Sequence, residues 1–230
     1  MLLGGLELEA LRTVTLCVTG APVPVEVGGR AVGSSYVVTA RAGELVRLGT
    51  PALGLRSYVA VRGGIDVPAV LGSRSRDVLA GLGPEPLAAG DLLPVGAAGG
   101  EPTPTDLLPP LRLPEVVELR VVRGPRDGWL ADADALTTSP WRVSDASNRV
   151  GMRLLGAPLA HRDPDRQLPS EGAWRGAVQV PPGGEPVVFL ADHPVTGGYP
   201  VAAVVVDADV DLAAQVRPGQ EVRFRWVSGG

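Results

Sequence analysis

The stretch LPSEGAWRGAVQVPPGGEPVVFLADHPVTGGYP, residues 168–200, decides how the rest of the chain is interpreted. Two short apolar runs, residues 177–180 and 186–190, are separated by the turn sequence Pro-Pro-Gly-Gly. Apolar and β-branched residues favour strands, while proline and glycine supply the fixed and the positive φ values that a tight turn requires. The stretch therefore predicts a β-hairpin.

The two flanks of this hairpin contain a group of polar residues. A hairpin places its flanks side by side, so we expect one candidate site formed by Glu171 from one flank and by Asp192, His193, Thr196 and Tyr199 from the other. Two glycines in the second flank, Gly197 and Gly198, leave backbone N–H groups free to face a ligand. The sequence therefore predicts a small-molecule site beside the hairpin.

The remaining chain favours a mostly β fold, because 31 glycines and 23 prolines in 230 residues interrupt it too often for long helices. Residues 12–19 alternate apolar and polar side chains, and Gly28-Gly29 predicts a hairpin between residues 23–27 and 36–40. One template, Gly-acid-Leu-apolar-x-apolar-Gly, occurs at 43–49 and 90–96 and more loosely at 219–224, and each copy predicts a tight turn that leads into a barrel strand. Short helices are expected at three places, residues 79–82, 129–136 and 210–216.

A proline-rich stretch with little periodicity, AAGGEPTPTDLLPPLRLP, occupies residues 97–114 and predicts a semi-rigid connector. We therefore expect a first β-barrel lobe at residues 1–98, a connector at 99–114 and a second lobe at 115–230 that contains the candidate site.

Charge and cysteine content exclude several classes of function. The net charge is −4 and the arginines are scattered, so neither nucleic acid nor an anionic membrane is an expected partner. The chain has no lysine, which excludes a lysine Schiff base, a P-loop lysine and a biotinyl-lysine, so any biotin must come from another polypeptide. Cys17 is the single cysteine, which fits a reducing compartment, and no apolar run reaches the ~20 residues of a membrane span. We expect a cytoplasmic protein.

Several segments together resemble one known family. They are SYVAVRGGIDVPAVLGSRSRD (57–77), GPRD (124–127), SNRVGMRL (147–154), the hairpin stretch 168–200 and RPGQEVRF (217–224). In this order they are similar to the allophanate hydrolase subunit 2 family, which includes the carboxyltransferase domain of urea amidolyase and the C-type subunit of prokaryotic 5-oxoprolinase. The resemblance extends over nearly the whole chain.

The resemblance implies a cyclophilin-like β-barrel architecture with two barrel-like lobes and a few short helices. It also implies a complex with a paralogous protein, the allophanate hydrolase subunit 1-like component, which is the B-type subunit of 5-oxoprolinase. Members of the family usually begin with about fifty further residues, so we expect this chain to be shortened at its start relative to them.

Three functions remain open at this stage. The first is the C-type subunit of an ATP-dependent 5-oxoprolinase, which converts 5-oxo-L-proline to L-glutamate together with the B-type and A-type subunits; this chain or a partner would bind the ATP. The second is the carboxyltransferase component of a biotin-dependent urea or amide carboxylase, with carboxybiotin brought by another chain. The third is a non-enzymatic antagonist that binds and sequesters the paralogous kinase-inhibitor subunit.

Both enzymatic readings require an acid-base group, which we assign to His193 and Asp192. His193 is favoured because its ordinary pKa lies nearest neutrality. Adjacent strand residues point to opposite faces, so we expect one of the two to enter the site. Glu171 either orients that base, binds a metal through water, or accepts backbone hydrogen bonds in a turn. A purely structural role for His193 also remains open.

Both readings also require groups that bind the substrate. Arg149 is the candidate for a carboxylate, with Arg153 as the reserve on an alternate position of the same expected strand, although both also fit a solvated surface. Asn148 and Gln179 can donate to an oxyanion or a ureido carbonyl, or can satisfy a strand end. Thr196, Gly197, Gly198 and Tyr199 complete the predicted substrate site. His161 is interpreted as an exposed loop residue, and no metal site is predicted.

Overall fold

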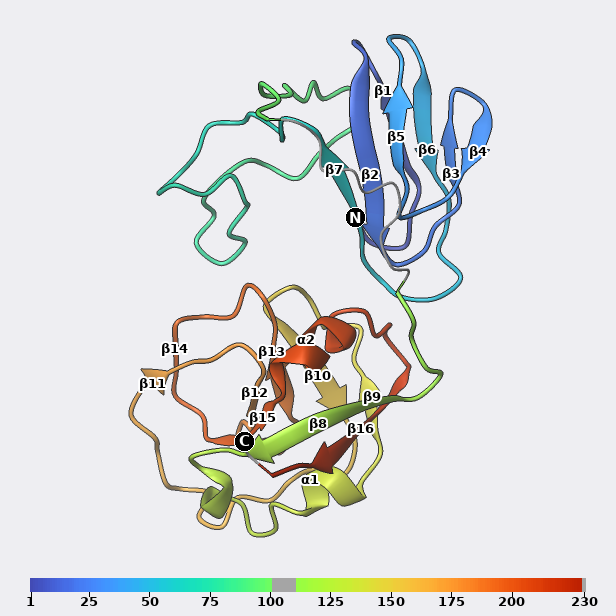
Figure 1. Cartoon of the computed structure of the whole chain (residues 1–230). Helices are drawn as coiled ribbons and strands as arrows, with labels where there is room; N and C mark the ends of the chain where they lie inside the picture. The colour runs from blue at the N-terminus through green and yellow to red at the C-terminus, as the bar shows by residue number, and fades with distance from the viewer. Residues whose placement is uncertain (101–110, 229–230) are drawn as a thin grey trace. The chain divides into compact units, whose positions relative to one another are not determined.

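The computed structural model describes residues 1–100 and 111–228, which form two compact units, Met1–Leu111 and Arg112–Gly230 (Figure 1). The mostly β, barrel-containing fold predicted from the sequence is confirmed. Most of the predicted connector, residues 101–110 of 99–114, lies outside the described residues. None of the helices in the described residues has the length and apolar composition needed to cross a membrane.

The first unit contains a four-stranded antiparallel sheet. Its strands, in order across the sheet, are β1 (Leu6–Glu9), β6 (Leu45–Leu48), β3 (Val25–Val27) and β4 (Arg30–Val32). Gly28 and Gly29 have φ values of 56° and 76°, which glycine adopts without the steric cost that a side chain adds, and they join β3 to β4. The predicted turn at Gly28-Gly29 is therefore confirmed. The strand that follows it in the hairpin is Arg30–Val32, so the prediction that residues 36–40 form the second strand of this hairpin was wrong.

A three-stranded sheet completes the first unit. Its strands, in order, are β5 (Val37–Ala40), β2 (Val14–Gly20) and β7 (Ser57–Val61). The predicted strand at residues 36–40 thus exists, paired with β2. Both sheets contribute to one apolar core, formed in part by Leu16, Val18, Val25, Val46 and Leu48. Cys17 is buried in β2, and this burial raises the pKa of its thiol.

Residues 62–98 of the first unit form turns and isolated bridges, so the short helix predicted at 79–82 was wrong. The Asp77 carboxylate accepts hydrogen bonds from the backbone N–H groups of Leu79 and Ala80 at 2.8 and 3.0 Å, and Gly81 and Gly83 have positive φ. Local side-chain bonds and left-handed glycines therefore replace helical turns here. The second template copy, residues 90–96, likewise forms no strand.

The second unit is built around a closed barrel. Its seven described strands, in order, are β10 (Gly151–Leu155), β13 (Val187–Phe189), β12 (Ala177–Gln179), β15 (Val201–Val205), β8 (Val117–Arg123), β16 (Glu221–Trp226) and β9 (Trp141–Val143). The β8–β16 pair is parallel, whereas the other barrel pairs are antiparallel. The template copies at 43–49 and 219–224 supply β6 and β16.

Alternate side chains of the barrel strands point into its core. Along β8, Val117, Leu119 and Val121 are fully buried, while Glu118 is exposed between them. The indole N–H of the buried Trp141 donates to the Leu136 carbonyl at 2.9 Å, so the one polar atom of this large side chain is satisfied. The hairpin strands β12 and β13 belong to this barrel, so the same core fixes their position.

The helices of the second unit are short. They are a 3-10 turn η1 (Asp127–Trp129) and the α-helices α1 (Ala135–Thr138) and α2 (Asp207–Ala213). The continuous helix predicted at 129–136 was wrong, because Ala131 donates to the Ala160 carbonyl at 2.9 Å and the Asp132 carboxylate accepts the Asp134 N–H at 2.9 Å. These bonds compete with helical ones. The helix predicted at 210–216 lies three residues earlier.

Candidate functional site

The hairpin predicted from residues 168–200 is present and supports the candidate site. β12 pairs with β13, and Gly184, with a φ of 78°, donates to the Pro181 carbonyl at 2.9 Å to close the turn. Beyond the hairpin, β11 (Glu171–Gly172) pairs with β14 (Thr196–Gly197) in a separate two-stranded ribbon (Figure 1). The two flanks therefore meet through their backbones, with Glu171 opposite Gly197.

Glu171 is held by a cation that the sequence interpretation missed. Both of its carboxylate oxygens accept hydrogen bonds from Arg126, one of them from Nε at 3.1 Å. These bonds keep the pKa of the Glu171 carboxyl below its ordinary value. Glu171 is thus an ionised group that fastens the ribbon to the loop after β8. The GPRD turn, quoted for the family resemblance, was the only signal for Arg126.

Arg149 and Asp192 form an ion pair at one end of the barrel. Arg149 Nη2 lies 2.6 Å from Asp192 Oδ2, and the Asp192 backbone N–H donates to the Arg149 carbonyl at 3.1 Å. About a third of the Asp192 side chain and half of the Arg149 side chain are exposed, so solvent and ligands reach the pair. Arg149 precedes β10 and lies in a turn, so its expected strand position was wrong.

The ring of His193 is fixed on both its face and its edge. It stacks on Phe189 with ring centroids 5.9 Å apart and planes inclined by 10°. Its Nδ1 lies 2.8 Å from the Pro194 carbonyl oxygen, which can only accept, so Nδ1 is the protonated nitrogen. In the neutral ring Nε2 therefore has the free lone pair, which is the arrangement a general base needs.

Asn148 lies in the turn before β10, and Arg153 lies on β10 itself. The Asn148 side-chain oxygen accepts from the N–H groups of Val150 and Gly151 at 2.8 and 3.2 Å, so it satisfies a strand end, as one of the two interpretations expected. Arg153 lies on β10 with its side chain exposed. Of the two arginines predicted to bind a substrate carboxylate, Arg153 is the one that forms no ion pair with an acidic side chain of the described residues.

Gln179 connects the barrel wall to the glycine-rich flank. Its amide is buried and donates to the Tyr199 carbonyl at 3.0 Å. A Cβ on Gly197 would lie 2.6 Å from Gln179 Nε2, so the absence of a side chain at 197 permits this approach. Thr196 is exposed on the ribbon. The Gln179 amide is consequently engaged in holding residues 197–199.

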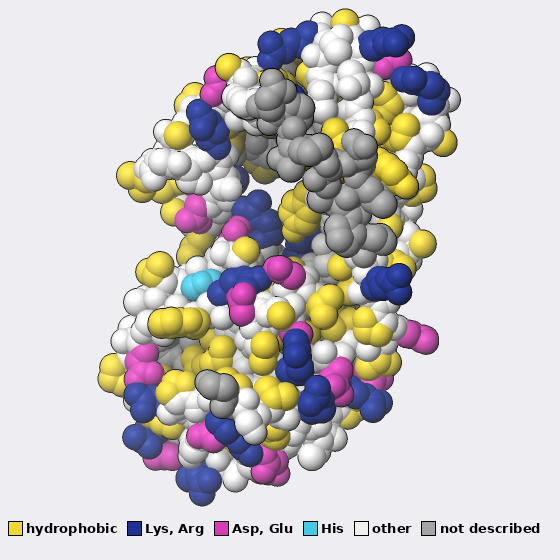
Figure 2. Space-filling view, in the orientation of Figure 1, with side chains coloured by type: hydrophobic (Ala, Val, Ile, Leu, Met, Phe, Trp, Pro, Cys, Tyr) yellow, Lys and Arg dark blue, Asp and Glu magenta, His cyan; other side chains and the backbone are white. Residues whose placement is uncertain are grey.

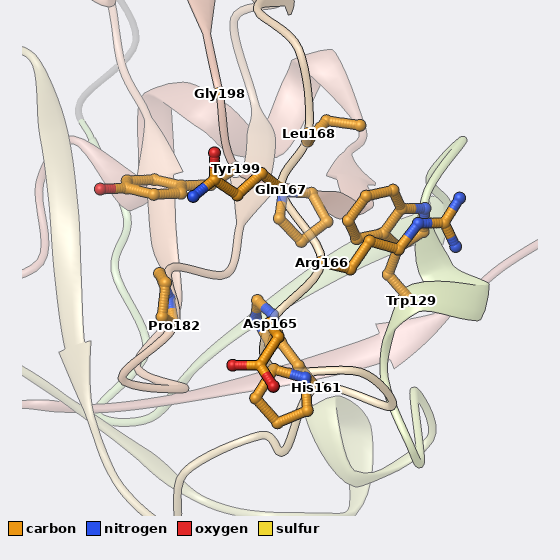
Figure 3. A pocket seen from close by; sticks show the side chains of 11 residues that line it. Trp129, His161, Asp165, Arg166, Gln167, Leu168, Pro182, Gly198 and Tyr199 are labelled. Carbon is orange, nitrogen blue, oxygen red and sulfur yellow. The ribbon is translucent and has the colours of Figure 1, made fainter.

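Gly198 and Tyr199 line a pocket of about 410 Å³ (Figure 3). Trp129, His161 and Arg166 also line it, although none of them was predicted as a site residue. His161 is half-buried, with Nε2 3.0 Å from the Val180 carbonyl oxygen, so its interpretation as an exposed loop residue was wrong. No periodic or motif signal in the sequence relates the loop at 161–168 to Trp129.

The predicted site residues thus make three sets of contacts. Glu171 and the ribbon pair with Arg126, Asp192 pairs with Arg149 beside His193, and Tyr199 faces the pocket. Acidic and arginine side chains are interspersed on the visible face of the second unit (Figure 2). Within residues 1–100 and 111–228, no group of three or more His, Cys, Asp or Glu side chains is arranged to hold a metal ion.

The family model for the carboxyltransferase domain, subdomain A and B, matches residues 1–226. The chain therefore belongs to this carboxyltransferase-domain family, as the resemblance implied.

Among individual proteins, the C-type subunit of 5-oxoprolinase from Escherichia coli is 37% identical over 227 residues, which are 96% of this chain and 72% of that protein. The solved structure of TTHA0988 matches 98% of this chain and 44% of its own, with a TM-score of 0.85 and 34% identity. The Kluyveromyces lactis urea amidolyase structure matches 99% of this chain and 15% of its own, with a TM-score of 0.88 and 25% identity. The chain thus spans about three quarters of the first protein and under half of the solved chains.

Proposed function

We propose that this chain is the C-type subunit of an ATP-dependent 5-oxoprolinase, which acts in the cytoplasm with a paralogous B-type subunit plus an A-type subunit. The observation that supports the proposal is the difference between two relatives. The chain is 37% identical to a stand-alone component of 5-oxoprolinase and aligns with most of it, but it is 25% identical to urea amidolyase and aligns with a small part of it.

In this proposal His193 is the acid-base group. Its Nδ1–H is committed to the Pro194 carbonyl and its ring is stacked on Phe189, so Nε2 is oriented to take a proton from the water that opens the lactam ring. Asp192 has a different role, because it is ion-paired with Arg149 at 2.6 Å. We assign Asp192 to positioning Arg149 rather than to proton transfer.

Arg149 is the proposed ligand of the substrate carboxylate. It is half exposed and already oriented by one carboxylate, so a substrate carboxylate binds by sharing or replacing Asp192. Arg153, exposed on β10, is the reserve cation. In this scheme the ion pair between Glu171 and Arg126 holds the ribbon in place. The backbone N–H groups of Gly197 and Gly198 are the proposed hydrogen-bond donors to the developing oxyanion.

ATP is assigned to a partner protein. The chain has no lysine, and Arg126 and Arg149, which contact the predicted site residues Glu171 and Asp192, are each paired with a carboxylate. A triphosphate placed there would have to displace Glu171 or Asp192. In this proposal the chain therefore binds the lactam, while phosphoryl transfer depends on groups of the A-type or B-type subunit.

The second candidate is the carboxyltransferase component of a biotin-dependent urea or amide carboxylase. It is favoured by the TM-score of 0.88 to urea amidolyase and by the family description. Biotin would then be supplied by another chain, because this one has no lysine to hold it. The third possibility is sequestration of the paralogous subunit without catalysis, which requires no acid-base or substrate-binding side chains at the candidate site.

The deciding experiment measures 5-oxoproline-dependent ATP hydrolysis and glutamate release by this chain co-purified with the B-type and A-type subunits. Coupled ADP and glutamate release that is lost when this chain is omitted supports the 5-oxoprolinase proposal. A stable complex that shows no turnover contradicts it. In that case bicarbonate-dependent carboxylation of urea, assayed with a biotin carboxylase and carrier, distinguishes the carboxylase from sequestration.

A further inference from the structure

Two large apolar side chains are exposed at the end of the ribbon β11–β14. Trp174 is 72% exposed and Val195 is 82% exposed, and the N–H of Ala173, next to Trp174 in the chain, donates to the Val195 carbonyl at 2.9 Å. Among the described residues, the Trp174 ring stacks on no other ring and its indole N–H donates to no acceptor. Neighbouring exposed apolar groups of this kind mark interaction surfaces.

The backbone that carries Trp174 is fixed. Its carbonyl oxygen accepts a hydrogen bond from the Ala177 N–H at 3.0 Å. The next residue, Arg175, forms ion pairs with both Asp207 and Asp211 of α2, the second at 2.5 Å. Trp is among the residue types enriched at the energetic centres of protein interfaces, and an anchor held in this way loses little backbone freedom on binding.

This end of the ribbon lies beside the loop that carries His193. The Gly176 N–H donates to the Phe189 carbonyl at 2.8 Å, so residues 173–176 are hydrogen-bonded to both ends of the loop 189–195. Figure 1 shows the ribbon at the periphery of the second unit, outside the barrel. A molecule docked on this end of the ribbon therefore also reaches the loop of the proposed acid-base group.

Charge indicates the kind of partner. Asp207 and Asp211 are 90% and 88% exposed and share Arg175, so two carboxylates and one guanidinium leave this edge of the second unit acidic. A second copy of this chain would bring two such edges together and oppose their carboxylates. An interface of standard size, about 800 Å² on each partner, would include these aspartates together with Trp174. A protein with an apolar pocket and basic side chains at its rim matches this surface.

We propose that Trp174 and Val195 anchor a protein–protein interface. The partner is the B-type subunit, which presents an apolar pocket with arginine or lysine side chains at its rim. This inference rests on the proposed function, to which it adds the surface of contact. Docking here places the partner against the loop of His193, so the candidate site lies at the interface and is shielded from bulk water.

The test is the dissociation constant of the complex between the whole chain and the purified B-type subunit, measured by biolayer interferometry. Trp174→Ala is expected to raise it about 30-fold or more, the effect typical of an interface hot spot, and Val195→Ala about fivefold. Trp174→Phe keeps an aromatic ring and is expected to raise it less. Thermal unfolding of all three variants is expected to match that of the unchanged chain, because the replaced side chains are exposed.

Leu155→Ala is the matched control. Leu155 is also exposed, but it lies at the end of β10 farthest from Arg149, and its truncation is expected to leave the dissociation constant unchanged. Asp207→Asn and Asp211→Asn are expected to slow association at low salt and to make its rate less dependent on ionic strength. Equal weakening by Leu155→Ala and Trp174→Ala would overturn the location.

Three other outcomes overturn the proposal. A B-type subunit that binds Trp174→Ala as tightly as the unchanged chain removes this surface and leaves the 5-oxoprolinase assignment intact. A B-type subunit that does not bind the chain removes the partner. Self-association of the chain that Trp174→Ala abolishes would assign the surface to a second copy. In contrast, a complex that depends on Trp174 but shows no turnover supports the surface and contradicts the proposed function.

Discussion

The Nδ1 atom of His193 lies 2.8 Å from the carbonyl oxygen of Pro194, the next residue in the chain. This contact fixes the tautomer of the ring and leaves the lone pair on Nε2. Because the ring is also stacked on Phe189, its orientation is set before any ligand binds.

His193→Gln is expected to lower turnover of the assembled complex about 10²-fold or more, the magnitude typical for loss of a general base. Its melting temperature is expected to stay close to that of the unchanged chain, because the side chain is only half-buried. Steady-state kinetics and thermal unfolding measure the two effects. Glu185→Gln, a change at an exposed residue, is the control, and undiminished turnover by His193→Gln removes His193 from the mechanism.

Arg149→Met tests whether the arginine binds a substrate carboxylate. We expect KM for 5-oxoproline to rise about tenfold while kcat changes less, because a contact made equally in the ground state and the transition state is lost. Asp192→Asn removes the carboxylate that positions Arg149 and is expected to raise KM less than Arg149→Met does. A rise in KM with Asp192→Asn but none with Arg149→Met would reverse the roles assigned to the two residues.

The pair Arg126 and Glu171 is expected to hold the two-stranded ribbon in place. Arg126→Met and Glu171→Gln should each accelerate hydrogen exchange at the Ala173 amide, which donates to the Val195 carbonyl at 2.9 Å. The double variant should exchange no faster than either single variant, because both remove the same contact. Additive effects would show that the two residues act independently.

Gly197 and Gln179 are expected to be energetically coupled. Gly197→Ala should destabilise the chain by about 1–3 kcal/mol, because its Cβ would lie 2.6 Å from the buried Gln179 amide nitrogen. In a Gln179→Ala background the same change should cost less, because the conflicting amide is gone. Urea unfolding of the two single variants and the double variant measures the coupling, and an equal cost in both backgrounds contradicts it.

Asp209 is expected to stabilise the barrel in a pH-dependent way. The buried carboxylate accepts hydrogen bonds from Arg120 Nη2, Nε and backbone N–H at 2.7, 2.9 and 2.8 Å, and the bonds from the guanidinium are the main cause that lowers its pKa below the ordinary 3.8. A lowered folded-state pKa adds stability that is complete above the unfolded-state pKa and is lost as the pH falls through the folded-state value.

Asp209→Asn should therefore cost about 1–3 kcal/mol at neutral pH, and the difference from the unchanged chain should shrink below about pH 4. Asp207→Asn is the control, because Asp207 is 90% exposed in its pair with Arg175 and should contribute about 0–1 kcal/mol. Urea unfolding across pH measures both. A difference for Asp209→Asn that grows on acidification would contradict the argument.

The hairpin was predictable because its determinants are local. Pro181-Pro182-Gly183-Gly184 specifies a turn, and the turn brings the two flanks side by side. The pairing of Glu171 with Gly197 does not follow from it, because the β12–β13 register continued outward would place Glu171 opposite Val195. The three template copies show the limit of such arguments. All begin with a glycine of positive φ, at 43, 90 and 219, but only two continue into strands, whereas residues 90–96 form an isolated bridge between Val95 and Ile65.

Contacts between distant residues were not predictable. Arg126 lies 45 positions from Glu171, and the Arg166–Trp129 contact joins a loop to a 3-10 turn that the sequence had assigned to a helix. Charge pattern alone does not say which of 21 arginines meets which carboxylate. Family resemblance drew attention to residues 124–127 and 147–154, but the partner of each polar side chain depends on the closed barrel.

The parallel pairing of β8 with β16 has a consequence for synthesis. β8 opens the second unit and β16 is its final barrel strand, with Val117 beside Val222 and Val121 beside Trp226. A nascent chain leaving the ribosome must therefore keep the free edge of β8 unpaired for about a hundred residues before its partner emerges. Truncation before residue 221 would leave this edge of β8 without its partner strand, open to pairing with another chain.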